Sequence, residues 1–393
     1  MKFALRSALC ALALVGCDPP DPPSTQNCAA FTQGALVTSP APSSLSIVAV
    51  APRYDAGRIR AMSLRDLTVR PLAIEATGDT VLRSLGDALA LLHRAVNEQD
   101  NLTLFHPPTG AVCQVALVSD EERSASPSRP YANAHDALAL DAGHIVVARH
   151  TMPSLAIIDV SQGAVRDTID LSPLRGDAPL PHPDALARVG DELWVTLERD
   201  DDPMRQHPTQ RGLVARINPR TRAVVGSIEL VHPNPVGPLR PSVDGSRRLV
   251  ATVGSYNVVG DGAIESIDPV TGVSTELVTE ADVEGNIDAF AVVDAHRLAL
   301  RVTAERQGTA AISVLRVVLF DLETRSARTL VELSQWGAAG PVAVGDRLFV
   351  SDPGEGIYHV GAGVRVFSPE GVELRGAIAM DPGLMPYDVQ PTP

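Results

Sequence analysis

Lysine is nearly absent from this chain of 393 residues, because Lys2 is the single lysine and arginine supplies the rest of the strong positive charge. Aspartate and glutamate outnumber lysine and arginine by 47 to 33, which gives a formal net charge of −14. A protein that binds nucleic acid needs a basic surface to face the phosphates. The composition therefore argues against a nucleic-acid partner.

Several motifs that mark enzymes or cofactors are also missing. The sequence has no Gly-x-Ser-x-Gly, no His-Glu-x-x-His and no glycine-rich phosphate loop before a helix. Its four cysteines form no Cys-x-x-Cys-His, which excludes covalently attached c-type haem. We predict no cofactor from these patterns and keep a divalent metal, calcium or zinc, as the one candidate.

Apolar runs long enough to span a membrane are absent, since such a helix needs roughly 20 apolar residues. The longest run, 8–15, follows Lys2 and Arg6 and precedes Gly16 and Cys17, which is the order of an export signal. Leu14-Val-Gly-Cys17 resembles the lipobox of bacterial lipoproteins. The resemblance implies cleavage before Cys17, lipidation of Cys17 and anchoring to the cell envelope, on the periplasmic face or the cell surface. An ordinary secretory signal is the alternative, and the choice of membrane stays open.

Residues 18–44 are rich in proline, serine and threonine without an apolar period, which predicts a tether. The folded body is then expected over 45–393, as one large domain. Cys28 lies in the tether and Cys113 in the body. In an oxidising compartment the two can form a disulfide, and two free thiols are the alternative.

The body is built from repeats. Six segments share the order strand, polar turn, strand; they are 101–117, 154–171, 212–230, 262–279, 317–333 and 363–380. Four of the turns combine proline with glycine or another turn-forming residue, which predicts antiparallel hairpins. A further strand opens each unit near Asp79, Asp136, Asp184, Leu239, Asp288, Pro341 and Asp388. These positions are 47 to 57 residues apart, a spacing typical of four-stranded propeller blades.

The two ends of the body complement each other. Residues 385–390 look like a first strand with nothing after it, whereas 45–51, 58–64 and 69–75 look like three strands without a first one. A blade shared by both termini would close a ring and remove two free sheet edges. The sequence therefore predicts an all-β fold, a seven-bladed β-propeller closed by strands from both termini. An open β-solenoid is the alternative.

The repeat resembles the YVTN-type bacterial propellers and the wider NHL-like and quinoprotein-like seven-bladed group, with Ile157-Ile-Asp-Val-Ser-Gln-Gly163 as the nearest match. This resemblance covers most of the body. It implies a ligand site where the loops before the first strands and after the second strands surround the central channel. Since the same architecture carries many functions, function has to be argued from a site.

Candidate site residues occupy those loops and strand starts: His135, Asp136, His150, His182, Asp184 and Asp288. Imidazole and carboxylate groups suit divalent metals, so these side chains can converge on a metal or a ligand at the channel mouth. The acidic run 198–202 is a candidate calcium loop. A recurrent aspartate is also what a fold feature looks like, for example a carboxylate that accepts backbone N–H groups at a turn.

Three functions compete. The sequence favours a non-enzymatic, monomeric binding or scaffold module that presents its loops to an envelope protein or polymer, because no catalytic constellation is evident. A metal-dependent lactonase or lyase with His135 or His182 as ligand or base is the first alternative. A redox partner similar to a quinoprotein subunit is the second.

Overall fold

The computed structural model describes residues 28–31, 36, 41–51, 54, 56–94, 101–125, 131–202, 208–256, 258–305, 313–334, 339–356 and 358–393. The predicted export signal with Cys17 and most of the predicted tether lie outside these residues.

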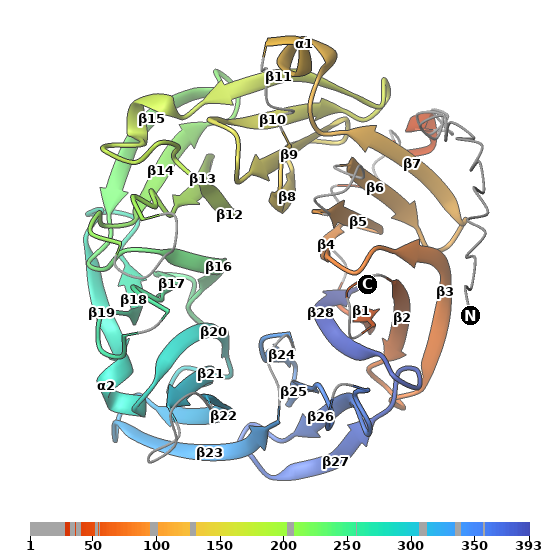
Figure 1. Cartoon of the computed structure of the whole chain (residues 1–393), viewed down its shortest axis with the longest axis vertical. Coiled ribbons are helices and arrows are strands. Elements are labelled where there is room, and N and C mark those ends of the chain that lie inside the picture. Colours follow the sequence, from red (N-terminus) through yellow and green to blue (C-terminus); the bar gives the residue numbers. More distant parts are fainter. Residues whose placement is uncertain are drawn as a thin grey trace, which may run out of the picture.

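Seven four-stranded antiparallel sheets surround a central channel, and the first strand of each sheet is the one nearest the channel (Figure 1). We name these sheets blades A to G. From the channel outwards, blade A comprises β28 (Met385–Thr392), β1 (Ser44–Val50), β2 (Gly57–Ser63) and β3 (Val69–Ala76). Blade B comprises β4 (Thr80–Leu85), β5 (Ala88–His93), β6 (Asn101–His106) and β7 (Ala111–Ala116). Blade C comprises β8 (Ala134–Ala139), β9 (His144–Arg149), β10 (Ser154–Asp159) and β11 (Ala164–Asp170).

Blades D to G continue the ring with β12 (Pro183–Val189), β13 (Glu192–Leu197), β14 (Leu213–Asn218), β15 (Ala223–Glu229); β16 (Pro235–Pro241), β17 (Arg248–Thr252), β18 (Ala263–Ile267), β19 (Ser274–Thr279); β20 (Asn286–Val292), β21 (Arg297–Glu305), β22 (Ser313–Asp321), β23 (Ser326–Leu333); and β24 (Val342–Val344), β25 (Arg347–Asp352), β26 (Gly363–Phe367), β27 (Glu373–Ile378). The helical pieces are short: η1 (Cys28–Phe31), α1 (Asp120–Ala125), η2 (Ser172–Leu174) and α2 (Glu280–Val283).

Local chemistry explains the hairpins that form the outer half of each blade. In blade C, Oδ1 of Asp159 accepts hydrogen bonds from the backbone N–H of Ser161 at 2.9 Å and of Gln162 at 3.2 Å, and Gly163 then adopts a φ of 60°. An aspartate that caps its own turn, followed by a left-handed residue, reverses the chain tightly. Asn218, Asp268 and Asp321 cap the equivalent turns of blades D, E and F.

Blade A is closed by both ends of the body, as predicted. Strand β28 pairs with β1 in antiparallel register from Ser44 opposite Thr392 to Val50 opposite Met385. With β28 as its first strand, blade A has four strands like the other blades. The predicted all-β seven-bladed fold is confirmed. Among the described residues, no helix is both long enough and apolar enough to cross a membrane.

Apolar side chains fill the spaces between neighbouring blades. The layer between blades C and D shows the principle, because Ile157 of β10 packs in one buried cluster with Val195 of β13 and Ile217 of β14. Each blade therefore presents an apolar face to its neighbour, whereas the side chains that line the channel and the outer edge of the ring can be polar.

Part of the predicted tether is packed on the propeller. Cys28 and Cys113 form a disulfide with their Cα atoms 4.8 Å apart, which ties η1 to β7. Phe31 and Leu36 are buried, and both belong to the cluster that fills the space between blades B and C. The expectation that all of 18–44 is a tether is thus too broad, because two apolar side chains within it complete a core.

Carboxylates of the innermost strands link neighbouring blades through hydrogen bonds. The backbone N–H of Leu82, Leu186 and Gly237 donates to Asp388, Asp136 and Asp184 at 2.8, 2.7 and 2.9 Å. In each pair the donor lies in the next blade of the ring. At these three positions the recurrent aspartate therefore has a role in the fold, as one of the two sequence interpretations held, and it accepts a backbone N–H of the next blade.

Candidate functional site

Two positions of the repeat meet at one end of the channel: the residue before the first strand and the residue after the second strand. The backbone N–H of His150, after β9, donates to the carbonyl of Asn133 at 3.2 Å, and that of Glu198, after β13, donates to the carbonyl of His182 at 3.0 Å. His150 and Glu198 thus occupy equivalent places in blades C and D. The fold brings both to the boundary between these blades.

Three histidine rings stack at this boundary. The ring centroids of His135 and His150 are 4.2 Å apart with an interplanar angle of 13°, and those of His150 and His182 are 4.9 Å apart with an angle of 29°. His182 is held by its backbone, which has a φ of 49° immediately before β12. The structure therefore gathers the three histidines that the sequence singled out.

A carboxylate orients His135. Its Nδ1 lies 2.6 Å from Oδ1 of Asp184, and its Nε2 lies 3.2 Å from Nδ2 of Asn133. Because an ionised carboxylate only accepts hydrogen bonds, Nδ1 is the nitrogen that carries the proton. Nε2 of the neutral ring then has a lone pair that can accept a hydrogen bond or bind a metal.

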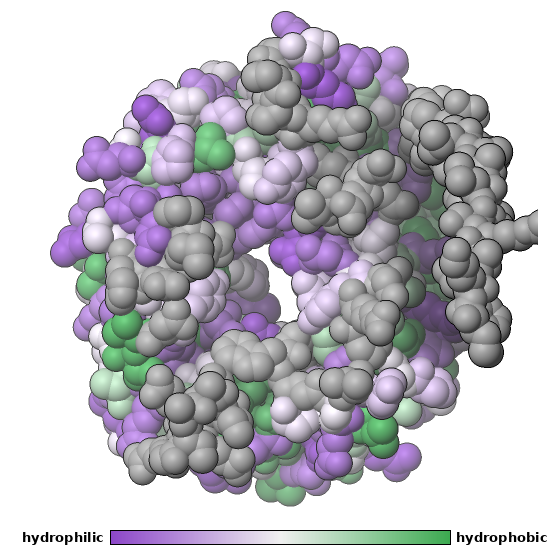
Figure 2. All heavy atoms as spheres, viewed as in Figure 1, coloured by the Kyte–Doolittle hydropathy of each residue, from purple (hydrophilic) through white to green (hydrophobic). Residues whose placement is uncertain are grey.

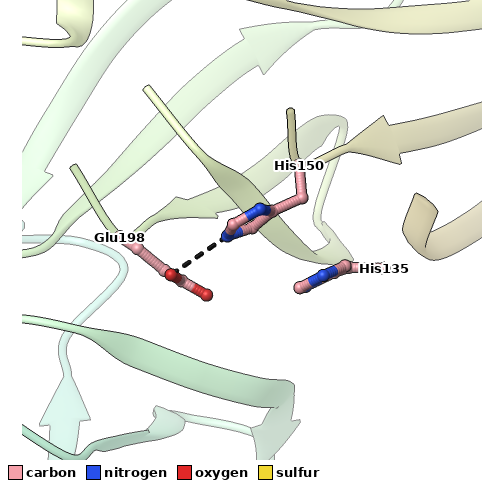
Figure 3. A group of neighbouring side chains, drawn as sticks. All are labelled: His135, His150 and Glu198. Carbon is pink, nitrogen blue, oxygen red and sulfur yellow. Dashed lines mark hydrogen bonds and ion pairs between the residues drawn. The ribbon is translucent and has the colours of Figure 1, made fainter. Parts of the chain in front are cut away.

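Glu198 completes the group from blade D. Its Oε2 lies 3.1 Å from Nε2 of His150, and both side chains are buried. Figure 3 shows Glu198 reaching the edge of the His150 ring while His135 lies alongside. One ring nitrogen from each histidine and one carboxylate oxygen of Glu198 lie within 4.8 Å of one another.

These three donors suit a transition metal. Zinc binds imidazole nitrogen and carboxylate oxygen at about 2.0–2.2 Å, and three protein ligands with one open position are typical of its catalytic sites. In a tetrahedral site, two ligands that each lie about 2.1 Å from the ion are about 3.4 Å apart, so the widest pair has to approach by up to roughly 1.4 Å. Calcium prefers six to eight oxygen ligands, and two imidazoles make a poor site for it.

A charged network lies beside the histidines. Arg83 of β4 pairs with Asp136 of blade C and, at 3.2 Å, with Asp388 of blade A, and its Nη2 donates to the carbonyl of His135 at 3.0 Å. Burial raises the pKa of Asp136, and the charge of Arg83 opposes that shift. Burial also raises the pKa of Asp184, against the opposing charges of His150 and Arg83.

Two predicted ligands have other partners. The oxygens of Asp136 accept from Arg83 and from the backbone N–H of Leu186 and Ala137. Asp288 lies in blade F, where Nε of Arg301 donates to it at 2.7 Å. Neither joins the histidine group, because each carboxylate already balances an arginine.

The acidic run 198–202 is divided by the fold rather than gathered into one cage of oxygens. Glu198 faces His150, whereas Asp200 accepts from the backbone N–H of Asp202 at 3.0 Å and Asp201 accepts from that of Thr209 at 2.9 Å. The calcium hypothesis for this run therefore has no support from the geometry.

Sequence reasoning named Glu198 only as part of the acidic run 198–202, and it did not single out Arg83. Glu198 is hidden in an acidic run, and Arg83 sits in an ordinary strand pattern. The repeat itself carries a signal that identifies Glu198, because the residue after the second strand occupies the same place in every blade, and two neighbouring blades have His150 and Glu198 there.

Tyrosines mark the same end of the channel. The chain has five, and each lies in a loop after a second strand, in a loop before a first strand or near the start of a first strand: Tyr54, Tyr131, Tyr256, Tyr358 and Tyr387. The rings of Tyr54 and Tyr387 contact each other edge to face with centroids 5.5 Å apart. Figure 2 shows the open channel with hydrophilic residues along its border.

Comparison with known proteins supports the fold. No family model and no curated protein sequence matches the chain. Among solved structures, a puromycin hydrolase mutant is 16% identical with a TM-score of 0.56 and covers 91% of this chain and 56% of its own. A streptogramin B lyase is 10% identical with a TM-score of 0.50, over 79% of this chain and 86% of its own.

The dihydro-heme d1 dehydrogenase NirN, in complex with DHE, is 14% identical with a TM-score of 0.48, over 88% of this chain and 67% of its own. At identities this low the likeness shows the fold alone. The chain is a seven-bladed β-propeller.

Proposed function

We propose that this chain is a non-enzymatic binding protein anchored to the cell envelope, and that it binds a divalent transition metal ion, zinc by preference, at the channel mouth. The observation that carries the proposal is the convergence of His135, His150 and Glu198 within 4.8 Å. Asp184 strengthens it, because a metal-binding histidine usually donates its second ring N–H to a carboxylate.

The surroundings of the metal group support recognition at this face. All five tyrosines lie at the same end of the channel, and tyrosine is enriched in protein binding surfaces. An envelope protein or a surface polymer that docks there would contact the metal group and the tyrosines together. The propeller supplies a rigid frame for both, which favours binding without a large loss of conformational entropy.

Anchoring through Cys17 belongs to the same proposal. The Cys28–Cys113 disulfide supports an oxidising compartment outside the cytoplasm. Mass spectrometry of the mature N-terminus is expected to find lipid on Cys17, and Cys17→Ser is expected to release the protein from the membrane fraction. An unlipidated Cys17, or unchanged membrane association of the variant, would refute the anchor.

Zinc titration of the full chain, stripped of metal and in competition with a chromophoric chelator, tests the metal site. We expect one ion per chain, and we expect His150→Ala and Glu198→Gln to weaken binding by about 100-fold or more. His144→Ala is the matched control, since His144 is the first residue of β9, at the other end of this strand from His150, and pairs with Asp141 at 2.9 Å. No uptake by the wild type, or equal uptake by His150→Ala, refutes the site.

A metal-dependent hydrolase or lyase is the second candidate, favoured by one observation. Three protein ligands leave a fourth position of zinc open for water or substrate, which catalytic sites require and structural sites lack. The zinc-loaded chain is then expected to turn over lactone or ester substrates, and to lose this activity in His150→Ala. Stoichiometric zinc binding without turnover would leave the binding function alone.

A further inference from the structure

Two arginines, Arg83 and Arg240, lie on innermost strands, and they differ in whether they pair with carboxylates. Arg83 lies in β4 and Arg240 in β16, and the charge of Arg83 acts on Arg240. Arg83 is paired with two carboxylates, Asp136 and Asp388. Among the described residues, no carboxylate forms an ion pair with Arg240.

The contacts of Arg240 hold its guanidinium in place without neutralising it. Nε donates to the carbonyl of Phe290 in blade F at 3.0 Å, and Cζ lies 5.9 Å from the centre of the Phe290 ring. Other arginines near the channel are balanced, since Arg94 pairs with Asp79 at 2.6 Å and Arg301 with Asp288 at 2.7 Å. The two terminal nitrogens of Arg240 are therefore the available donors.

Burial acts on this uncompensated charge. Burial and, second to it, the charge of Arg83 lower the pKa of Arg240 to about 10, against the opposing charge of Asp388. The group is still cationic at neutral pH. Arg240 is half-buried, and a partly desolvated cation without a carboxylate partner is placed to bind an anion from solution.

We propose that the channel contains a second ligand site, in which the terminal nitrogens of Arg240 bind the carboxylate of a small organic molecule. Arginine and carboxylate form two parallel N–H···O bonds in one plane, which is the strongest geometry available to a guanidinium whose Nε is already engaged. This site does not depend on the metal group, and it adds an anionic ligand to the proposed function.

The charges around Arg240 select a ligand with a single negative charge. The charge of Asp388 acts on Arg240, and Arg83, which also acts on Arg240, pairs with Asp136. One ligand carboxylate neutralises the single positive charge of Arg240. A phosphate dianion would bring a second negative charge towards these aspartates, and it is expected to bind less well.

Calorimetric titration of the metal-free full chain at constant ionic strength tests the site, with acetate, inorganic phosphate and chloride as probes. We expect saturable acetate binding that weakens about tenfold or more in Arg240→Gln, because a charge-assisted pair of hydrogen bonds is lost. Arg188→Gln is the matched control. Arg188 also lies on an innermost strand and donates to a backbone carbonyl of the neighbouring blade, that of Leu140 at 2.7 Å, but it is exposed.

Thermal melting separates a ligand site from a structural role. Arg240→Met keeps an apolar stem against Phe290, and in acetate-free buffer it is expected to melt no lower than the wild type. Acetate is expected to raise the melting temperature of the wild type and of Arg188→Gln but not of Arg240→Met. Equal responses to acetate in all three proteins, or phosphate binding through Arg240 that is tighter than acetate binding, would overturn the proposal. Because no zinc is present, failure here leaves the metal site untouched, and failure of the metal site leaves this one untouched.

Discussion

Oδ1 of Asp184 lies 2.6 Å from Nδ1 of His135, across the boundary between blades D and C. The other oxygen of the same carboxylate accepts the backbone N–H of Gly237 in blade E at 2.9 Å. One side chain therefore links three consecutive blades and fixes the ring that faces the metal group. Site and scaffold are coupled at this residue.

Asp184→Asn tests that coupling. The amide oxygen can still accept from Gly237, but the charge that orients His135 is gone, so we expect zinc affinity to fall about 10- to 100-fold. Asp184→Ala removes the acceptor as well and is expected to lower the free energy of unfolding by about 1–3 kcal/mol. Zinc titration and urea unfolding measure the two effects. Asp191→Asn, at the exposed turn after β12, is the control, and equal zinc affinity in both Asn variants would contradict the role of Asp184.

Arg83→Met should destabilise the ring more than the loss of an exposed ion pair. It leaves Asp136 and Asp388 without their cation, and breaking a buried pair from one side costs about 3–5 kcal/mol. Arg211→Met is the comparison, because Arg211 pairs with Glu229 at 3.1 Å on the surface and such pairs contribute about 0–1 kcal/mol. Urea unfolding of both variants checks the order, and similar losses would show that the Arg83 network is not structural.

The fold was predictable because its determinants are local and repeated. Turn residues such as Asp159 and Gly163 act within a few positions of the chain, so the hairpins are visible as a pattern in the sequence. Closure of blade A was also predictable, since 385–390 and 45–75 are complementary parts of one repeat. The ring then follows from stacking of like units.

The site was only partly predictable because its contacts run between blades. His135, His150 and His182 are unusual residues at repeat positions, and they could be singled out on that ground. Whether Asp136 binds a ligand or an arginine depends on Arg83, which is 53 residues away in another blade. Such pairings are set by blade packing, and no spacing in a single sequence reveals them.

Reduction of the disulfide is expected to destabilise the whole propeller rather than the N-terminal segment alone. The Cys28–Cys113 bond spans 85 residues and holds the buried Phe31 against the space between blades B and C. Removal of a native disulfide typically costs about 2–5 kcal/mol. Thermal melting with and without reductant measures the loss, with Cys28→Ser as the control that should melt low and ignore reductant. Equal melting of the wild type in both conditions would show that the disulfide contributes nothing to stability.

Glu280 gives the protein a pH dependence of a defined sign. It is buried at the start of α2, where its carboxylate accepts the backbone N–H of Gly260 at 2.8 Å and those of Gly262 and Ile287 at 3.2 Å. Burial raises its pKa from 4.5 to about 7, against the opposing effect of these hydrogen bonds.

Between these two pH values the folded state binds more protons at Glu280 than the unfolded state does, so this contribution to stability is complete below about pH 4.5 and is lost as the pH rises through 7. Glu280→Gln keeps an oxygen acceptor without a titrating group. We therefore expect the free energy of unfolding of the wild type to fall relative to that of Glu280→Gln as the pH rises from 4.5 to 8 in a urea-unfolding series. Glu284→Gln, a change at an exposed residue four positions along, is the control and should follow the wild type. Parallel curves for the wild type and Glu280→Gln would contradict the prediction. They would mean that Glu280 stays ionised in the folded protein because its three N–H donors outweigh its burial.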